Sequence, residues 1–380
     1  MKTWNVKCTS CDTVLPGTTR VNLCPKCEQP MWAVSTEPLP GRDAILANRW
    51  DMWRYSALLP LQAGEVPASL GEGCTPMLDL PALAKDVGVR RLWVKDEGVN
   101  PTASFKARGL CAAVTRARGV PGIVVPTAGN AGAALAAYGA AAGIPVRIFA
   151  PRTTPRPILD IIRAYGAGLE LLDGHIGDAG KAARAYAAEH GWFDVSTCRE
   201  PYRTEGNKTL GMEVAEQLDW TLPDVIVYPT GGGEGIIGMW KAFAEMREAK
   251  WIAAQGALPR LVVAQAAGCA PLVRAYGAGA DRATPWENPV THAAGLRVPG
   301  PLGDRLVLRA LRESRGLAAA ASEDIIREQT AVLASMTGVD AAPEGGCALA
   351  VLRGLVRAGQ IAPSESVVVF NTGSGASYRA

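Results

Sequence analysis

Short apolar segments of strand length alternate with helical segments along most of this 380-residue chain. Strands are expected over residues 90–97, 122–127, 145–151, 223–230, 259–266 and 365–375. Helices are expected between them, over residues 105–119, 132–143, 156–167, 178–191 and 236–250. Such an alternation is typical of parallel sheets that helices cover on both faces. The chain is therefore predicted to be an α/β protein.

The composition argues against several classes of protein. Hydrophobic residues make up 48% of the chain and charged residues 20%, which allows a core large enough for two domains plus an appendage. The net charge of +3, without a basic stripe interleaved with aromatic residues, argues against a nucleic-acid partner. Residues 119–146 carry no charge, but prolines and glycines interrupt them, so no membrane span is expected. The N-terminus lacks the apolar segment of a secretion signal, which favours the cytoplasm.

The first 34 residues contain two Cys-x-x-Cys pairs, and twelve residues separate the pairs. Four thiolates from two such pairs suit the tetrahedral coordination of Zn²⁺. Nine cysteines in a chain without an export signal also favour thiols or metal ligands over disulfides. We expect a structural zinc site, and the alternative is four reduced thiols in a site that has lost its metal. The expected ligands are Cys8, Cys11, Cys24 and Cys27.

The segment "YPTGGGEGIIGMW" (228–240) joins an apolar strand to a helix. Its glycines leave backbone N–H groups uncovered at a helix N-terminus, where such groups bind phosphate with the help of the helix dipole. Gly233, Gly235 and Gly238 also match the dinucleotide pattern G-x-G-x-x-G, but the following strand ends without the carboxylate that holds a ribose. A single phosphate is therefore favoured over NAD, with a plain tight turn as the alternative.

Two further turns at strand ends carry polar groups. In "PTAGNAGAA" (126–134) the N–H groups could hold a carboxylate, and Asn130 either offers its amide to a ligand or caps the helix. In "FNTGSG" (370–375), Thr372 and Ser374 place small hydroxyls at a strand end, although an ordinary loop has the same composition. Ligands of such folds bind beyond the carboxyl ends of the strands, so we expect these turns to contribute to one site.

The segment "NPTASFKARG" (100–109) places Lys106 after a turn and at the start of a helix. The positive end of a helix and partial burial both lower the pKa of a lysine. A lowered pKa yields the neutral amine that forms a Schiff base with a carbonyl compound. The alternative is an exposed lysine in a first helical turn. Such a lysine, a phosphate-binding glycine turn, and amide and hydroxyl donors together describe a pyridoxal phosphate site.

These motifs resemble those of the fold-type II pyridoxal phosphate-dependent enzymes and, within that group, the threonine synthases. The resemblance runs from the N-terminal cysteine unit to "NTGSG" and includes "LGEGCTPM" (70–77). It implies two parallel-sheet α/β domains of the tryptophan synthase β-like class, with a small N-terminal zinc-ribbon-like unit, and it implies a homodimer. The implied division is a zinc-ribbon-like unit at 1–34, a large pyridoxal phosphate domain at 35–100 and 199–380, and a small α/β domain at 101–198.

The resemblance also implies roles for individual residues. Lys106 would form the Schiff base, Asn130 would bond the cofactor's 3′-oxygen, and Thr372 would bond its pyridine nitrogen. The N–H groups of residues 127–131 would receive the substrate carboxylate. The implied cofactor-binding residues are Phe105, Lys106, Asn130, Gly231, Gly232, Gly233, Glu234, Gly235 and Thr372. The implied substrate-binding residues are Thr127, Ala128, Gly129, Ala131, Arg203 and Lys208.

Arg203 and Lys208 lie in "PYRTEGNKT" (201–209), which resembles the segment that supplies an arginine for the substrate phosphate. Surface solvation is the alternative for both side chains. Other features depart from the commonest threonine synthase pattern. Ala103 stands where glycine is usual, Ala107 where aspartate is usual, and Ala131 where a hydroxyl residue often helps to bind the substrate phosphate. The motif "NTGSG" also lacks the usual histidine and lysine, so the departures concern the substrate rather than the cofactor.

The resemblance implies a carbon–oxygen lyase that converts O-phospho-L-homoserine and water to L-threonine and phosphate. An alternative on the same cofactor is β-elimination or β-replacement on another amino acid: O-phosphoserine as in cysteate synthase, or threonine, serine or diaminopropionate as in the ammonia-lyases. A non-enzymatic alternative is a nucleic-acid- or partner-binding ribbon joined to a retired catalytic domain. The intact Lys106 and both glycine turns argue against retirement, and four basic and two acidic residues in 1–34 are too weak a balance for binding a phosphate backbone.

Overall fold

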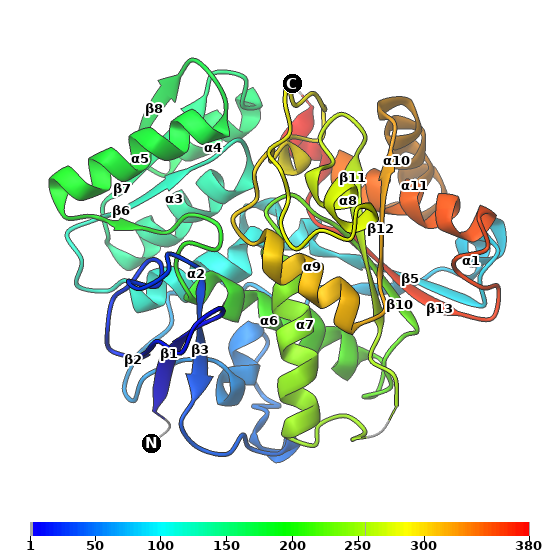
Figure 1. Ribbon diagram of the computed structural model, residues 1–380, viewed down its shortest axis with the longest axis horizontal. Coiled ribbons are helices and arrows are strands. Elements are labelled where there is room, and N and C mark those ends of the chain that lie inside the picture. The colour runs from blue at the N-terminus through cyan, green and yellow to red at the C-terminus, as the bar shows by residue number, and fades with distance from the viewer. Residues whose placement is uncertain (1–2, 255, 380) are drawn as a thin grey trace.

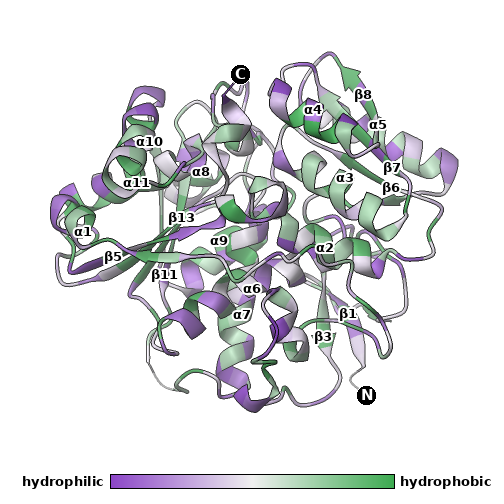
Figure 2. Cartoon of the chain, turned by 180° about the vertical axis from the view of Figure 1, so that it is seen from behind, coloured by the Kyte–Doolittle hydropathy of each residue, from purple (hydrophilic) through white to green (hydrophobic). Residues whose placement is uncertain are grey.

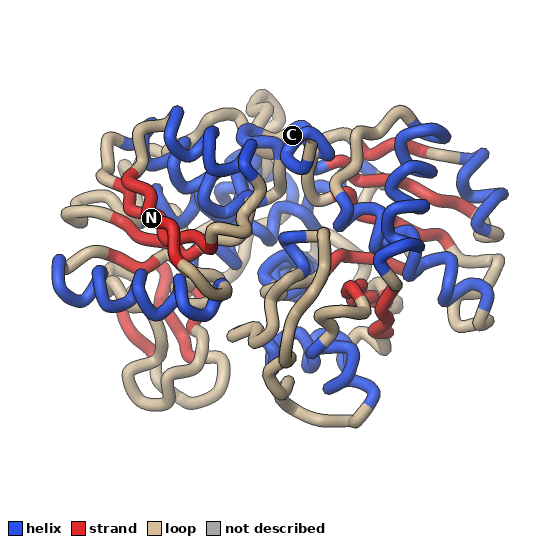
Figure 3. Tube along the Cα trace, turned by 90° about the horizontal axis from the view of Figure 1, so that it is seen from above, coloured by secondary structure: helices blue, strands red, loops and turns tan. Residues whose placement is uncertain are grey.

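The computed structural model of this protein describes residues 3–254 and 256–379. Within these residues the strands form one three-stranded, one six-stranded and one four-stranded sheet (Figure 1). The four-stranded and six-stranded sheets lie at opposite ends of the molecule, as the view from above also shows (Figure 3). The three-stranded sheet lies near the N-terminus, below the four-stranded sheet in the view of Figure 1.

The six-stranded sheet confirms the predicted parallel arrangement. Its strand order is β12-β11-β10-β13-β5-β4, and every pair is parallel except β4 with β5. Four of its strands coincide with predicted strand segments, because each is a short apolar run that is buried on both faces. The strands are β4 (Met77–Asp79), β5 (Arg91–Asp96), β10 (Val225–Pro229), β11 (Arg260–Ala266), β12 (Leu317–Ala321) and β13 (Ser366–Asn371).

Helices cover this sheet on both faces, and successive residues of β10 show how. Val225 and Val227 pack into a core with one group of helices, whereas Ile226 and Tyr228 pack into a second core with the other group. The first group is α1 (Pro81–Val87), α10 (Glu323–Thr337) and α11 (Pro343–Arg357). The second group is α6 (Tyr202–Gln217), α7 (Glu234–Glu248), α8 (Pro271–Gly277) and α9 (Asp304–Glu313).

The four-stranded sheet is parallel throughout, with the order β8-β7-β6-β9. Its strands are β6 (Ile123–Pro126), β7 (Val146–Pro151), β8 (Gly168–Leu172) and β9 (Phe193–Asp194). Three helices cover one face, and α5 (Ile176–His190) covers the other. The three are α2 (Lys106–Arg116), α3 (Asn130–Ala142) and α4 (Arg156–Ala164). Helix α3 has no charged residue and is drawn mainly in green, as befits a helix buried along most of its length (Figure 2).

The N-terminal sheet is antiparallel and has the order β2-β1-β3. Its strands are β1 (Trp4–Cys8), β2 (Val14–Pro16) and β3 (Met31–Ser35). Two contacts show that the sheet packs on α6. The N–H of Ala33 donates to Glu205 at 3.1 Å, and the Trp4 ring lies 5.6 Å from the Lys208 ammonium. The predicted division into domains at residues 34, 100 and 198 stays a prediction.

Short 3₁₀ helices complete the secondary structure. They are η1 (Arg42–Ala44), η2 (Met52–Leu58), η3 (Glu97–Val99), η4 (Pro101–Ala103), η5 (Ala294–Leu296) and η6 (Gly375–Tyr378). The Pro- and Gly-rich stretch 283–303 has no regular element other than η5, and Gly295 and Leu296 of that element reach the cavity described below. Across the described part of the chain, none of the helices has both the length and the apolar character that crossing a membrane requires.

Candidate active site

Several strand ends and helix starts line one cavity at the centre of the molecule. The turn of residues 231–235 follows β10 and begins α7, Lys106 begins α2, Asn130 begins α3, and Thr372 follows β13. Asn130, the turn of residues 231–235 and Thr372 follow the carboxyl ends of parallel strands, where ligands bind in this class of fold. The structure thus brings the predicted turns together around one cavity. Its lining consists of Phe105, Lys106, Asn130, Tyr228, Pro229, Thr230, Gly231, Gly232, Gly233, Glu234, Gly235, Gly295, Leu296, Glu344 and Thr372.

Lys106 presents an uncommitted amine to this cavity. Its Nζ lies 4.2 Å from the centre of the Phe105 ring and makes no hydrogen bond or ion pair with a described residue. Burial lowers the pKa of Lys106 to about 8; Glu234 opposes this effect and Arg203 adds to it. In about a tenth of the molecules, Lys106 therefore carries a neutral amine at pH 7. The amine needed for attack on a carbonyl carbon is thus available near neutral pH.

The glycine turn offers a row of backbone donors. The N–H groups of residues 231–235 donate no hydrogen bond to any described part of the fold, and they lie at the N-terminus of α7. Gly233 has a φ of 92°, a left-handed conformation that favours glycine. A Cβ atom on Gly235 would lie 2.1 Å from the hydroxyl oxygen of Tyr228. The turn therefore needs these glycines, and its free N–H groups fit a phosphate.

The second turn, at residues 127–131, is partly used by the fold itself. The N–H of Thr127 donates to the carbonyl of Phe149 at 2.9 Å, and the N–H of Gly129 donates to the Thr127 hydroxyl at 3.0 Å. Of the five N–H groups expected to receive a substrate carboxylate, those of Ala128, Asn130 and Ala131 have no partner among the described residues. The turn thus retains fewer free donors than the sequence suggested, since Thr127 organises the loop.

Asn130 and Thr372 supply polar side chains to the cavity. The side-chain oxygen of Asn130 is buried and accepts no hydrogen bond from a described residue. The carbonyl of Thr372 accepts the N–H of Phe105 at 3.1 Å, which ties the end of β13 to the residue before Lys106. A buried amide oxygen without a hydrogen-bond partner carries an energetic cost, and a ligand in the cavity that donates to Asn130 would relieve it.

The two cations predicted to bind a substrate phosphate do not line the cavity. Arg203 is 1% exposed and does not line the cavity; its Nη2 lies 2.7 Å from Oε2 of Glu234, which does. Lys208 is fully buried and pairs with Glu205 at 2.9 Å and with Glu245 at 2.5 Å. The structure therefore keeps Arg203 beside the site, whereas it commits Lys208 to the interface between α6, α7 and the N-terminal sheet. Neither side chain is solvated at the surface.

Glu344 is a lining residue that the sequence did not reveal. Its Oε1 accepts the hydroxyl of Tyr378 and the N–H of Gly295, the latter at 2.7 Å. Its Oε2 is buried without a hydrogen-bond partner in the described structure, and burial raises the pKa of the Glu344 carboxyl. An acidic residue near the start of a helix is ordinarily explained by the helix dipole. The segment "APEGG" (342–346) therefore did not indicate a functional role for Glu344.

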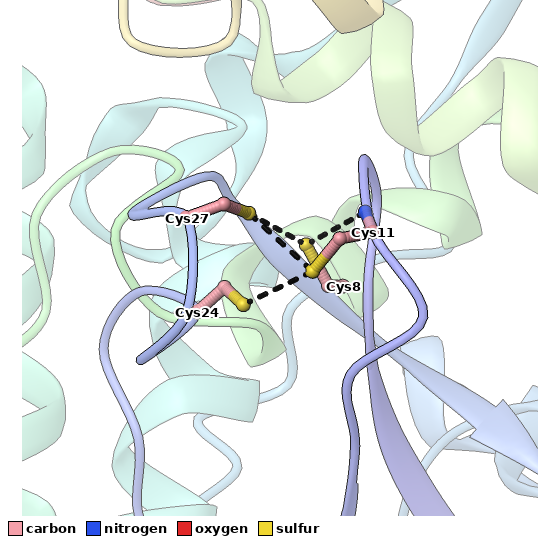
Figure 4. Close-up of side chains that lie close together, drawn as sticks. All are labelled: Cys8, Cys11, Cys24 and Cys27. Atoms are coloured by element: carbon pink, nitrogen blue, oxygen red, sulfur yellow. Dashed lines mark hydrogen bonds between the residues drawn. The ribbon is translucent and has the colours of Figure 1, made fainter.

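The four cysteines of the N-terminal unit meet as predicted. Their sulfur atoms lie within 4.8 Å of one another, and Figure 4 shows the side chains pointing toward a common centre. The N–H groups of Ser10 and Cys11 donate to the Cys8 sulfur at 3.3 and 3.4 Å. Four sulfur donors at such separations could hold a metal ion, and a set of four thiolates suits tetrahedral Zn²⁺.

The α/β fold and the cavity that Lys106 lines define a class of protein. An amine with a lowered pKa lines the same cavity as a turn that fits a phosphate, and the unpartnered side-chain oxygens of Asn130 and Glu344 belong to the same lining. This combination suits an enzyme whose cofactor carries both an aldehyde and a phosphate, and pyridoxal phosphate is such a cofactor. The residues present thus fit the group. The family model described as "pyridoxal-phosphate dependent enzyme" matches residues 68–373, and the chain belongs to this family.

Individual relatives narrow the comparison. The chain is 33% identical over 377 residues to a threonine synthase of Methanosarcina acetivorans, covering 97% of this chain and 91% of that protein. It is 34% identical over 327 residues to a threonine synthase of Methanocaldococcus jannaschii, covering 85% of this chain and 80% of that protein. Among solved structures, maize serine racemase superposes with a TM-score of 0.69 at 23% identity, covering 79% of this chain and 88% of the racemase. That structure supports the fold alone.

Proposed function

We propose that this protein is a lyase that converts O-phospho-L-homoserine and water to L-threonine and inorganic phosphate. The observation that carries the proposal is the uncommitted Lys106 amine opposite the free N–H groups of residues 231–235. The reaction itself is taken from the relatives that cover most of the chain, which are threonine synthases. The resemblance supports, as parts of the same proposal, a cytoplasmic homodimer and a structural Zn²⁺ held by Cys8, Cys11, Cys24 and Cys27.

The cofactor and the chain divide the chemistry between them. Bound pyridoxal phosphate supplies an aldehyde that condenses with amines and a ring that withdraws electrons from the α-carbon of an amino acid. The N–H groups of residues 231–235 hold its phosphate, Asn130 and Thr372 orient its ring, and Phe105 packs beside the amine. The N–H groups of Ala128, Asn130 and Ala131 bind the substrate carboxylate.

Lys106 moves the protons of the reaction. When its Nζ is neutral, it can accept the proton from the α-carbon, and the resulting ammonium can return a proton later. Its pKa near 8 keeps both forms populated around neutral pH, which suits a group that serves as base and acid in turn.

A second candidate function is β-elimination from an amino acid without a phosphate, such as serine or threonine. The observation that favours it is the ion pair of Arg203 with Glu234, because a neutralised guanidinium attracts a phosphate dianion less. The alanine at position 131, where a hydroxyl residue often contacts the substrate phosphate, points the same way.

Product analysis separates the two candidates. The purified holoenzyme is incubated with O-phosphohomoserine, O-phosphoserine, threonine and serine in parallel, and threonine, phosphate, 2-oxo acids and ammonia are quantified. The proposal expects threonine and phosphate in equal amounts from O-phosphohomoserine alone. Phosphate release without threonine, or ammonia from serine or threonine as the fastest reaction, would sink the primary proposal.

A further inference from the structure

A buried arginine lies directly behind the glycine turn, and a carboxylate separates it from the cavity. Arg203 belongs to the first turn of α6, and Glu234 is the first residue of α7. Their side chains are 1% and 0% exposed, and Nη2 of Arg203 lies 2.7 Å from Oε2 of Glu234. Glu234 lines the cavity and Arg203 does not. The Glu234 carboxylate therefore contacts both the cavity and this guanidinium.

The guanidinium keeps donors that the fold does not use. Its Nη1 donates to the carbonyl of Val195 at 2.8 Å, but its Nε makes no hydrogen bond to any described residue. The backbone at Arg203 is fixed, since the N–H groups of Tyr202 and Arg203 donate to Glu200 at 2.7 and 2.8 Å. Nε and Nη2 form one edge of the planar group, and such an edge binds two oxygens of a phosphate.

Glu234 has other groups that stabilise its negative charge when Arg203 turns to a ligand. Its Oε1 accepts the N–H of Cys198 at 2.8 Å, and its position at the first residue of α7 places it at the positive end of that helix. The nearby Lys106 ammonium is also attracted to it, because Glu234 raises the pKa of Lys106. Release of the ion pair therefore does not leave an unsupported carboxylate in the interior.

We propose that Glu234 is a resident counter-ion of Arg203, which an anionic group of the substrate must displace, so that Glu234 sets how tightly the enzyme binds the substrate's phosphate. This inference rests on the proposed function, because it takes a phosphorylated amino acid as the substrate. A phosphate dianion that carries two charges competes successfully with one carboxylate for the Nε–Nη2 edge. A substrate whose distal group is a hydroxyl cannot displace Glu234, and the ion pair then stays closed.

Titration calorimetry of the holoenzyme with inorganic phosphate tests the proposal. In the holoenzyme the cofactor phosphate occupies the glycine turn, so added phosphate reports on Arg203. Glu234→Gln keeps the size and one oxygen of the side chain but removes its charge, and it should tighten phosphate binding at least tenfold. Adding Arg203→Gln to that variant should abolish the gain. The matched control is Glu216→Gln, which removes a carboxylate from a distant ion pair with Arg54 and should leave phosphate binding unchanged.

Two results would overturn the proposal. One is a Glu234→Gln enzyme that binds phosphate no more tightly than the wild type. The other is a gain that persists when Arg203 is also replaced, since the phosphate then binds elsewhere. If Glu234→Gln fails to retain the cofactor, Glu234→Asp serves instead: its carboxylate is one methylene shorter, so phosphate should bind more tightly than to the wild type, by a smaller factor.

The phosphate titration and the product analysis together distinguish a failure of the counter-ion role from a failure of the proposed function. Tighter phosphate binding in Glu234→Gln, together with no threonine from O-phosphohomoserine in the wild type, supports the counter-ion role and rejects the threonine synthase reaction. Threonine formation in the wild type with phosphate affinity unchanged by Glu234→Gln does the reverse.

Discussion

Among single residues, the proposed chemistry depends on one lysine, whose environment differs from that of the paired cations. Lys95, Arg108, Lys208 and Lys241 are buried in ion pairs, whereas Lys106 is half-buried without one. Burial without a partner disfavours the ammonium form, so the pKa falls. The physical effect that would destabilise a structural lysine thus favours the neutral amine that the proposed chemistry needs.

This environment predicts a pH dependence for cofactor binding. The rate at which the apoprotein recombines with pyridoxal phosphate should increase with pH through about 8 and level off above it, because only the neutral amine of Lys106 reacts. An ordinary lysine would give a rate that still rises near pH 10.4. Stopped-flow measurement of the visible absorbance checks this, and a rate still rising steeply at pH 10 would contradict a lowered pKa.

The residues of the cavity differ in how readily the sequence reveals them. Asn130, the glycine turn and Thr372 each stand where an apolar strand gives way to a helix or loop, and Lys106 begins a helix after a turn, so fold class and local composition together indicate them. Glu344 comes from the start of a helix with no unusual composition, and only packing places it in the cavity. The sequence could not show which of Arg203 and Lys208 lies nearer the site. Residues on every face of α6 are buried, so the positions of its polar residues do not indicate which face turns toward the cavity.

At the scale of elements, the position of Lys106 depends on how α2 is fixed. Arg108, two residues further along α2, lies 2.7 Å from Glu97 and 2.6 Å from Glu213 of α6. Lys95 of β5 completes the group at 2.8 Å from Glu213. These four side chains are at most 2% exposed and carry no net charge together, so they join α2, α6 and β5 without leaving a charge unpaired.

Removing one member of this group should be costly. Glu213→Gln leaves two buried cations with one carboxylate, and we expect it to lower the free energy of unfolding by about 3–5 kcal/mol. Glu216→Gln on the same helix is the control and should cost about 1 kcal/mol or less, because its ion pair with Arg54 is partly exposed. Urea denaturation measures both, and equal losses would argue against a special role for the buried group.

The same group predicts a loss of stability in acid. Burial alone would raise the pKa of Glu213, but Arg108 and Lys95 outweigh that effect and hold the pKa well below its ordinary value. A carboxyl with a lowered pKa in the folded state binds fewer protons than in the unfolded chain, so its contribution is complete at neutral pH and declines below about pH 4.3. Thermal unfolding from pH 6 to 3 should show a steeper loss in the wild type than in Glu213→Gln.

Close packing of α2 on α6 gives a further prediction. A Cβ atom on Gly206 would lie 2.3 Å from the carbonyl oxygen of Arg108, so Gly206→Ala must push the two helices apart. We expect a loss of about 1–3 kcal/mol in stability and weaker cofactor binding, because Lys106 moves with α2. Gly177→Ala in α5 is the matched control, since a Cβ there meets nothing within 4 Å and should be neutral or stabilising. Equal cofactor affinity in the two variants would contradict this coupling.

Across the whole molecule, the sequence predicted the alternation of strands and helices well and the relations between distant segments poorly. Short apolar runs such as β10 and β13 are buried on both faces, so local composition suffices to find them. The pairing of β13 with β5 joins segments more than 270 residues apart, and nothing local indicates such a neighbour. The contact of the N-terminal sheet with α6 likewise depends on tertiary packing.

Through that contact, the cysteine unit packs on α6, the helix that also carries Arg203. We expect one zinc ion per chain by elemental analysis, and Cys24→Ser should abolish it and lower the melting temperature, because metal binding and folding of such units are coupled. Cys74→Ser is the control, since Cys74 lies outside the cluster, and it should leave the zinc content unchanged. Full zinc content in Cys24→Ser would reject these four sulfurs as the ligands.

The central claim is that Lys106 carries the cofactor, and reductive trapping tests it most directly. The holoenzyme is treated with borohydride, which fixes the cofactor to the amine that holds it, and the digested protein is mapped by mass spectrometry. We predict the pyridoxyl adduct on the peptide that contains Lys106 and no adduct in Lys106→Ala. An adduct on a different lysine, or unchanged visible absorbance in Lys106→Ala, would contradict the account.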